Sequence, residues 1–168
     1  MKTAVVYISK NGTTQSTVDK MKAVSNSSVT YFNLQETTNI DITSYNKIYI
    51  GFGIYAGTLP KPMRTFLENK ELEKATTVFF IHALDSADKY NFIMESSVRN
   101  NAWMKKSKAY YLGGACDIKK QGFFVKQLLK MIAKKKNLDV NNMTNLDEKA
   151  IEGFISDFKN TFGKLCAE

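Results

Sequence analysis

Residues 3–14 read TAVVYISKNGTT, an apolar run that passes straight into a polar loop with one glycine. The run 3–8 is almost wholly apolar or β-branched, which is typical of a central strand covered on both faces. The loop 9–14 combines hydroxyl side chains, an amide and Gly12, and apolar residues follow it at helical spacing, at Val18 and Met21. The stretch therefore predicts a strand, a polar loop and a helix in immediate succession.

The rest of the chain continues this alternation. Short apolar runs rich in β-branched or aromatic residues predict four further strands, at 29–34, 47–52, 76–83 and 108–112. Apolar residues at helical spacing predict helices at 60–72, 92–98, 121–136 and 146–165. Buried strands alternating with helices predict an α/β fold: a doubly wound, five-stranded parallel sheet with helices on both faces.

Length and composition exclude several classes of protein. The 168 residues fit a single domain spanning 1–168, and 43% hydrophobic residues suffice for a packed core. No apolar run reaches the roughly 20 residues that cross a bilayer, and the run at 4–8 is too short for a secretion signal. Two cysteines and one histidine argue against a disulfide framework, a zinc site and a Ser-His-Asp triad. We therefore expect a soluble protein of the cytoplasm.

The positive charge is concentrated in one segment. The chain has a formal net charge of +8, and residues 105–136 contain ten lysines and one acid, Asp117. The predicted helix 121–136 within this segment places its apolar residues inward: Phe124, Leu128, Met131 and Ile132. The lysines then form either a solvated face of a sheet-covering helix or a docking surface for an anionic partner. Candidates for such a partner are an acidic protein, an anionic lipid surface and a nucleic acid.

Three polar loops follow predicted strands, at 9–14, 53–58 and 84–88. In open parallel sheets, ligands bind beyond the carboxyl ends of the strands. Hydroxyl groups and backbone N–H groups at a helix N-terminus favour an anion, which makes the loop 9–14 a candidate phosphate site. The alternative is an ordinary helix cap by Thr13 or Thr14. A P-loop is absent, and Gly51 and Gly53 do not complete a dinucleotide fingerprint.

With these motifs the sequence resembles the flavodoxin family, whose phosphate loop reads Ser/Thr-x-Thr-Gly-x-Thr. Ser9, Gly12 and Thr14 match this pattern, and Asn11 replaces the middle threonine. Residues 45–57, YNKIYIGFGIYAG, are similar to the branch that contains menaquinone-dependent protoporphyrinogen oxidase. That branch also carries an extra segment after the fifth strand, which corresponds here to a basic helical insertion at about 113–145.

The resemblance implies FMN as the cofactor. It assigns the phosphate to six consecutive residues: Ser9, Lys10, Asn11, Gly12, Thr13 and Thr14. It assigns one edge of the isoalloxazine ring to a second loop: Ile54, Tyr55, Ala56 and Gly57. The other edge falls to Leu84 and Asp85, and Tyr55 is the candidate for stacking on the ring. Four residues near these loops are expected to pack in the interior instead: His82, Tyr90, Trp103 and Cys116.

The resulting hypothesis is a flavin-dependent redox protein that exchanges electrons with a partner protein or a quinone. One alternative is a quinone-linked dehydrogenase resembling protoporphyrinogen oxidase. A second is a non-enzymatic module that binds an acidic partner or a membrane through its lysines. We expect a cytoplasmic location with peripheral contact to an anionic membrane. Nucleic acid is disfavoured, because no recognition motif or stacking aromatic array accompanies the lysines.

Overall fold

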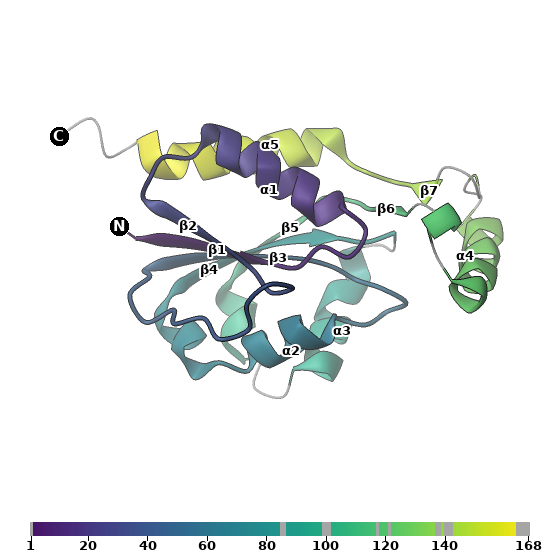
Figure 1. The fold of residues 1–168 in the computed structure, drawn as a ribbon, viewed down its shortest axis with the longest axis horizontal. Coiled ribbons are helices and arrows are strands. Elements are labelled where there is room, and N and C mark those ends of the chain that lie inside the picture. Colours follow the sequence, from purple (N-terminus) through teal and green to yellow (C-terminus); the bar gives the residue numbers. More distant parts are fainter. Residues whose placement is uncertain are drawn as a thin grey trace.

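The computed structural model describes residues 2–84, 87–98, 102–116, 118–120, 122–136, 139 and 143–163. Its main sheet has five parallel strands in the order β2-β1-β3-β4-β5 (Figure 1). Their bounds are β1 Thr3–Tyr7, β2 Val29–Asn33, β3 Lys47–Gly53, β4 Thr76–His82 and β5 Lys108–Tyr111. The predicted doubly wound parallel sheet is thereby confirmed, and each strand lies within one residue of its predicted ends.

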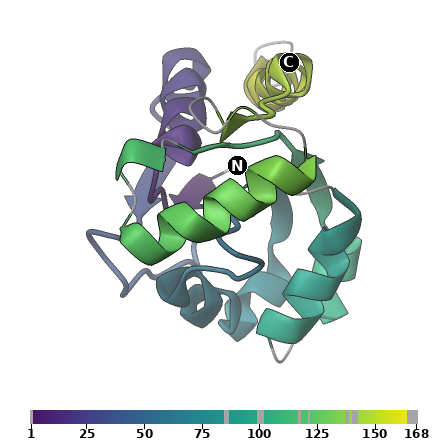
Figure 2. The ribbon, with the colours of Figure 1, turned by 90° about the vertical axis from the view of Figure 1, so that its right-hand side faces the viewer.

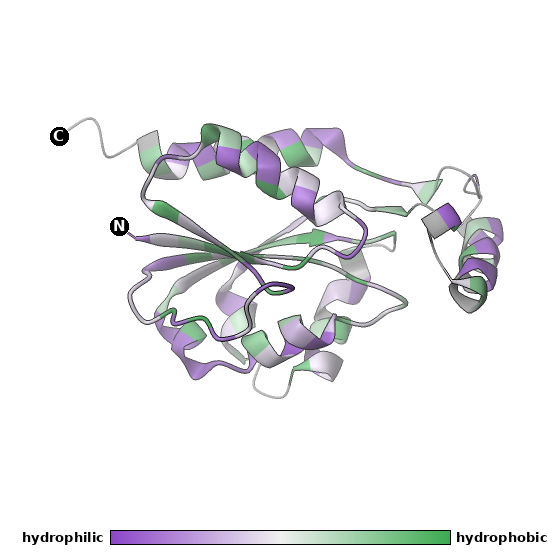
Figure 3. Cartoon of the chain, in the orientation of Figure 1, coloured by the Kyte–Doolittle hydropathy of each residue, from purple (hydrophilic) through white to green (hydrophobic). Residues whose placement is uncertain are grey.

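Helices cover both faces of the sheet (Figure 1). One face carries α1 (Thr13–Val24) and α5 (Glu148–Gly163), and the other carries α2 (Lys61–Leu67) and α3 (Tyr90–Ser97). Successive strand residues point to opposite faces, so Val5 packs toward α1 and α5 while Ala4 and Val6 pack toward α2 and α3. Green residues recur along the strands in Figure 3, whereas purple residues recur along the helices.

The helix predicted at 60–72 is shorter than its apolar spacing indicated. It ends as α2 at Leu67, and a 3-10 helix, η1 (Lys70–Lys74), follows. Asn69 separates the two because its backbone is extended and its side-chain oxygen accepts the N–H of Glu71. An asparagine in this role starts a new helix rather than continuing the old one. Leu72 is buried all the same.

The chain leaves the sheet after β5 and returns to it before α5. This excursion contains β6 (Ala115–Cys116), a 3-10 turn η4 (Ile118–Lys120), α4 (Phe123–Lys136) and β7 (Met143–Thr144). The short strands β6 and β7 pair antiparallel at its base. Figures 1 and 2 show α4 beyond the carboxyl ends of the strands, lying across that end of the sheet.

The position of α4 does not fit one of the two interpretations of this segment, a helix that covers a face of the sheet. Leu129 and Ala133 are buried, whereas Met131, which was expected inward, is exposed. The cause is that α4 touches the body of the molecule at the end of the sheet and not across a whole face. The other residues expected inward have side chains outside the described part of the structure: Phe124, Leu128 and Ile132. Among the described residues, none of the helices is both long enough and apolar enough to cross a bilayer. Two further 3-10 helices, η2 (Ala87–Lys89) and η3 (Ala102–Lys106), flank α3.

Candidate functional site

The loop 9–14 lies where the strand order reverses. The strand β1 has β2 on one side and β3 on the other, and the loop continues from its carboxyl end into α1. The N–H of Ile8 donates to the carbonyl of Gly51 at 3.0 Å, which holds the start of the loop against β3. Such a reversal leaves a crevice between neighbouring loops, and this is where open α/β sheets bind ligands.

The loop is shaped for an anion at the N-terminus of α1. Gly12, with φ 86°, precedes the helix without a side-chain cap, and the first turn holds no acidic residue. The N–H groups of Thr13 and Thr14, the first helical residues, have no acceptor within the helix. The space that a Cβ of Gly12 would enter is open, with no atom within 4 Å. Free donors, the helix dipole and open space together fit a phosphate group.

Thr14 adds a buried hydroxyl that lacks a partner. Its residue is 1% exposed, and its Oγ1 makes no hydrogen bond to the described residues. By contrast, the Ser9 hydroxyl accepts the N–H of Gln15 at 3.0 Å, so it caps the helix. Leaving a buried hydroxyl unsatisfied costs roughly 1–3 kcal/mol. A phosphate oxygen in the loop would accept from Thr14 and remove that cost.

Tyr55 reaches into this loop from the end of β3. Its hydroxyl accepts the backbone N–H of Lys10 at 3.1 Å and also that of Asn11. The Nζ of Lys10 lies 5.6 Å from the centre of the Tyr55 ring. Burial raises the pKa of Tyr55, and the two N–H groups partly oppose that rise. The phenol oxygen of Tyr55 is therefore hydrogen-bonded to backbone N–H groups of the candidate phosphate loop.

The rest of the second loop forms a tight turn. Tyr55 and Thr58 exchange backbone hydrogen bonds of 3.0 and 2.9 Å across it. Between them, Ala56 and Gly57 both have positive φ, 49° and 74°, as in a type I′ hairpin turn. Both are exposed, and Ile54 is half-buried with its N–H donated to the carbonyl of His82 at 2.9 Å. The turn therefore lies at the carboxyl end of β3 and is anchored on β4.

The excursion after β5 contributes contacts that the sequence did not indicate. The Thr13 hydroxyl donates to the carbonyl of Ala115 at 3.2 Å, and the Asn11 amide lies 3.7 Å from Sγ of Cys116. Cys116 was expected as a small buried residue, and it is half-buried. The strand β6 thus lies against the candidate phosphate loop. The pair Gly113-Gly114 was the available signal, since it lets the chain turn toward that loop directly after β5.

The third predicted loop is only partly described. Leu84 is half-buried and packs against an apolar cluster of the excursion, which consists of Ile118, Leu129, Ala133 and Met143. Asp85 lies outside the described residues. The structure therefore brings loop 9–14, Tyr55 and β6 together, and places Leu84 beneath α4. The assignment of these residues to a cofactor stays a prediction.

His82 is a satisfied interior residue at the end of β4, as expected. Its Nδ1 lies 2.8 Å from the carbonyl of Gly113, which can only accept, so Nδ1 carries the proton. Nε2 then accepts from the Thr17 hydroxyl at 3.0 Å. Burial lowers the pKa of His82 to about 4, although the bond to Gly113 opposes this. The neutral ring ties β4 to α1 and to the start of the excursion.

We expect acid to destabilise the protein through His82. Below the ordinary pKa of 6.5 the unfolded chain takes up a proton that the folded chain refuses until about pH 4. Stability is therefore lost as the pH falls between these values, by roughly 2 kcal/mol at pH 5 relative to pH 7.5. Urea unfolding at both pH values measures this loss. In His82→Gln the loss should shrink by that amount, and equal losses in both proteins would contradict the assignment.

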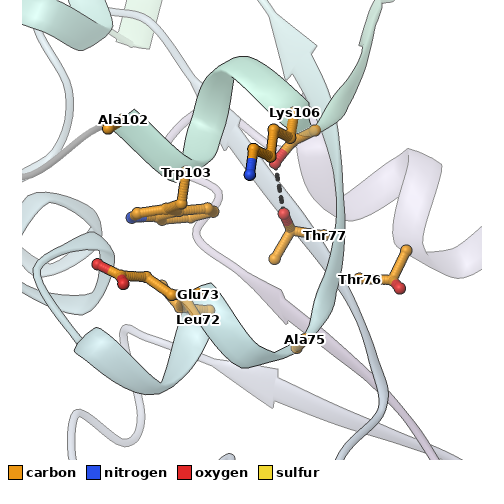
Figure 4. Close-up of a pocket in the computed structure, with 9 residues that line it drawn as sticks. Leu72, Glu73, Ala75, Thr76, Thr77, Ala102, Trp103 and Lys106 are labelled. Atoms are coloured by element: carbon orange, nitrogen blue, oxygen red, sulfur yellow. Dashed lines mark hydrogen bonds between the residues drawn. The ribbon is translucent and has the colours of Figure 1, made fainter.

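Tyr90 and Trp103 pack in the core, as predicted. Both contact Phe79, with ring centres 6.1 and 6.0 Å apart, respectively. Trp103 also borders a pocket of about 550 Å³, where Figure 4 shows its indole above Leu72 and Glu73. Thr76 and Thr77, at the amino end of β4, line the same pocket. This pocket is at the wrong end of the strands for the ligand site of an open parallel sheet.

Comparison with solved structures finds the same architecture in one case and two less similar structures. The oxidised flavodoxin 2 of Bacillus cereus is 15% identical, with coverage of 96% of this chain and 100% of that one and a TM-score of 0.55. Flavodoxin 1 of Bacillus cereus is 15% identical over 83% of this chain and 100% of that one, with a TM-score of 0.49. A flavoprotein of Lactobacillus acidophilus in complex with FMN is 16% identical. The match covers 67% of this chain and 92% of that one, with a TM-score of 0.46.

Sequence comparison gives the family. Curated protein sequences include no match to this chain. The flavodoxin domain, however, matches residues 4–141, which include all five strands of the sheet except Thr3 and all three candidate loops. Because this match spans well over half of the sequence, the chain belongs to the flavodoxin domain family.

Proposed function

We propose that the chain binds FMN at the carboxyl end of its sheet and carries electrons between redox partners. Membership of the flavodoxin domain family supports the choice of cofactor. The observation that carries the proposal is the buried Thr14 hydroxyl without a partner among the described residues, next to the N–H groups of Thr13 and Thr14 at the start of α1. These donors suit the phosphate of FMN.

The chain's own residues would bind and orient the cofactor. The N–H groups at the start of α1 and the Thr14 hydroxyl would hold the phosphate, with Lys10 beside it. The turn at 54–57 would line one edge of the ring, and Leu84 with Asp85 the other. The bound flavin supplies the redox chemistry, and the protein supplies position and electrostatics. The excursion would limit water at the phosphate loop through Ala115 and Cys116.

A titration of the purified apoprotein with FMN tests this proposal. We expect saturable quenching of flavin fluorescence and a visible spectrum that changes on binding. Riboflavin, which lacks the phosphate, should bind more weakly, because the loop 9–14 then gains nothing. A protein that binds neither compound would support the non-enzymatic alternative, a module that uses its lysines alone.

Removal of the Tyr55 hydroxyl should strengthen FMN binding. In the structure this hydroxyl takes N–H groups of Lys10 and Asn11 that a phosphate would need. Tyr55→Phe keeps the ring and removes the competing acceptor, and one net hydrogen bond is worth about 1 kcal/mol. We expect FMN to bind about five- to tenfold more tightly by fluorescence titration, with riboflavin unchanged. Equal gains for both flavins, or none, would contradict competition for the loop.

A quinone-linked dehydrogenase is the second candidate within this class. Two observations support it: the similarity of residues 45–57 to the protoporphyrinogen oxidase branch, and the basic helix α4. Anaerobic mixing of the dithionite-reduced holoprotein with a water-soluble naphthoquinone distinguishes the two. Rapid reoxidation at low quinone concentration with saturation supports a quinone site, whereas a slow, strictly second-order reaction supports a carrier.

A further inference from the structure

Among the α4 side chains that the structure describes, two are buried against the rest of the molecule, Leu129 and Ala133. Leu129 is 9% exposed and Ala133 is fully buried. These residues are four positions apart and therefore share a side of the helix. They join a small apolar cluster with Ile118 and Met143, against which Leu84 packs. Figure 2 shows the helix lying across the carboxyl end of the sheet.

The outward side combines large apolar residues with lysines. Phe123 is 70% exposed and Met131 is 67% exposed. Eight residues make slightly more than two helical turns, so both side chains stand on a common side. Lys130, Lys134 and Lys135 are exposed as well. The sequence of α4, FFVKQLLKMIAKKK, contains five lysines and no acidic residue to neutralise them.

We propose that this outward face, formed by Phe123, Lys130, Met131, Lys134 and Lys135, docks on an anionic lipid bilayer. The lysines would meet the anionic headgroups, and the phenylalanine and methionine would enter the boundary of the acyl chains. Charge complementarity is strong, because residues 105–136 hold ten lysines and one acid. Each lysine near such a surface strengthens binding about fivefold, so several give reversible attachment.

Two other anionic partners fit this face less well. A nucleic acid offers no apolar phase for Phe123 and Met131. Protein interfaces are depleted of lysine relative to the rest of the protein surface, whereas three of the five residues of this face are exposed lysines. An anionic bilayer interacts both with the lysines and with the exposed apolar side chains of the face, and it requires no directional hydrogen bonds. The docking itself does not depend on FMN.

One consequence does rest on the proposed function. Because α4 packs on Leu84 at the carboxyl end of the sheet, docking turns that end toward the bilayer. The proposed FMN site would then face the phase in which lipid-soluble electron acceptors dissolve.

Co-sedimentation of the full-length protein with vesicles tests the docking. We expect binding to vesicles that contain phosphatidylserine, little binding to pure phosphatidylcholine, and release as salt rises from about 0.05 to about 0.5 M. The triple variant Lys130→Gln, Lys134→Gln, Lys135→Gln should lower the partition coefficient about 100-fold. Phe123→Ser should lower it about tenfold.

Matched control variants distinguish an effect of this face from the effect of losing positive charge, or an exposed phenylalanine, anywhere on the surface. Lys61→Gln, Lys149→Gln, Lys159→Gln removes the same charge from exposed sites outside α4, and Phe92→Ser removes another exposed phenylalanine, 74% exposed on α3. Both should keep nearly full vesicle binding. Equal recovery in the supernatant with both lipid types would overturn the proposal. Equal weakening by the two triple variants would also overturn it, as would retention on double-stranded DNA without vesicle binding. Thermal melting confirms that each variant is folded.

Discussion

Gly113→Ala is expected to destabilise the fold by roughly 3 kcal/mol or more. Gly113 has φ 67°, a conformation that costs an L-residue about 1 kcal/mol or more. A Cβ at this position would also stand 2.0 Å from the backbone oxygen of Asn145 and 2.8 Å from the Leu146 Cα. Backbone atoms cannot turn aside as a flexible side chain can, so the clash must move the chain.

The displacement would affect three elements at once. The Gly113 carbonyl accepts a hydrogen bond from Nδ1 of His82. The neighbouring Gly114 donates its N–H to Oδ1 of Asn145 at 2.7 Å, and the Gly114 carbonyl accepts the N–H of Asn145 at 2.9 Å. These bonds fasten the end of β4, the base of the excursion and the start of the segment leading to α5. The loss therefore falls on the whole fold.

Urea unfolding measures this loss, with Gly153→Ala as the matched control. Gly153 lies within α5 and is exposed, and a Cβ there meets no atom within 4 Å. The control should gain roughly 0.5–1 kcal/mol, because alanine is the better helix former. If Gly113→Ala loses less than about 1 kcal/mol, the close approach to Asn145 does not constrain this position.

The sequence predicted the sheet well because strands buried on both faces consist of nearly continuous apolar runs. In β3, six of the seven residues are buried, so the strand is recognisable as such a run. The loops at 9–14 and 53–58 followed directly, since they lie between those runs. The break at Asn69 was missed because Leu72 continues the apolar spacing, although asparagine before Glu71 was a usable local signal.

The sequence did not predict how the site is assembled around those loops. Lys10 and Tyr55 are 45 residues apart, and Asn11 and Cys116 are 105 residues apart. No local pattern encodes such contacts. The packed side of α4 was ambiguous for another reason: apolar residues stand on several of its sides, so spacing alone could not distinguish Leu129 and Ala133 from Met131.

Thr14→Val should weaken FMN binding by roughly 1.5–3 kcal/mol, about 10- to 150-fold, if the phosphate occupies the loop 9–14 as proposed. Valine has nearly the shape of threonine and adds no bulk to a residue that is 1% exposed. The variant removes only the hydroxyl that the described residues leave without a partner. The free protein should therefore lose little stability, since an unsatisfied buried hydroxyl does not stabilise it.

Thr3→Val is the control that makes this test specific. Thr3 is also fully buried, and its Oγ1 likewise has no partner among the described residues, but it begins β1 at the opposite end of the sheet. Fluorescence titration should give the control the affinity of the wild type for FMN. Riboflavin should bind Thr14→Val and the wild type equally, because the lost contact is to the phosphate. If Thr14→Val binds FMN like the wild type, the phosphate does not lie beside this hydroxyl and the loop acts as a helix cap.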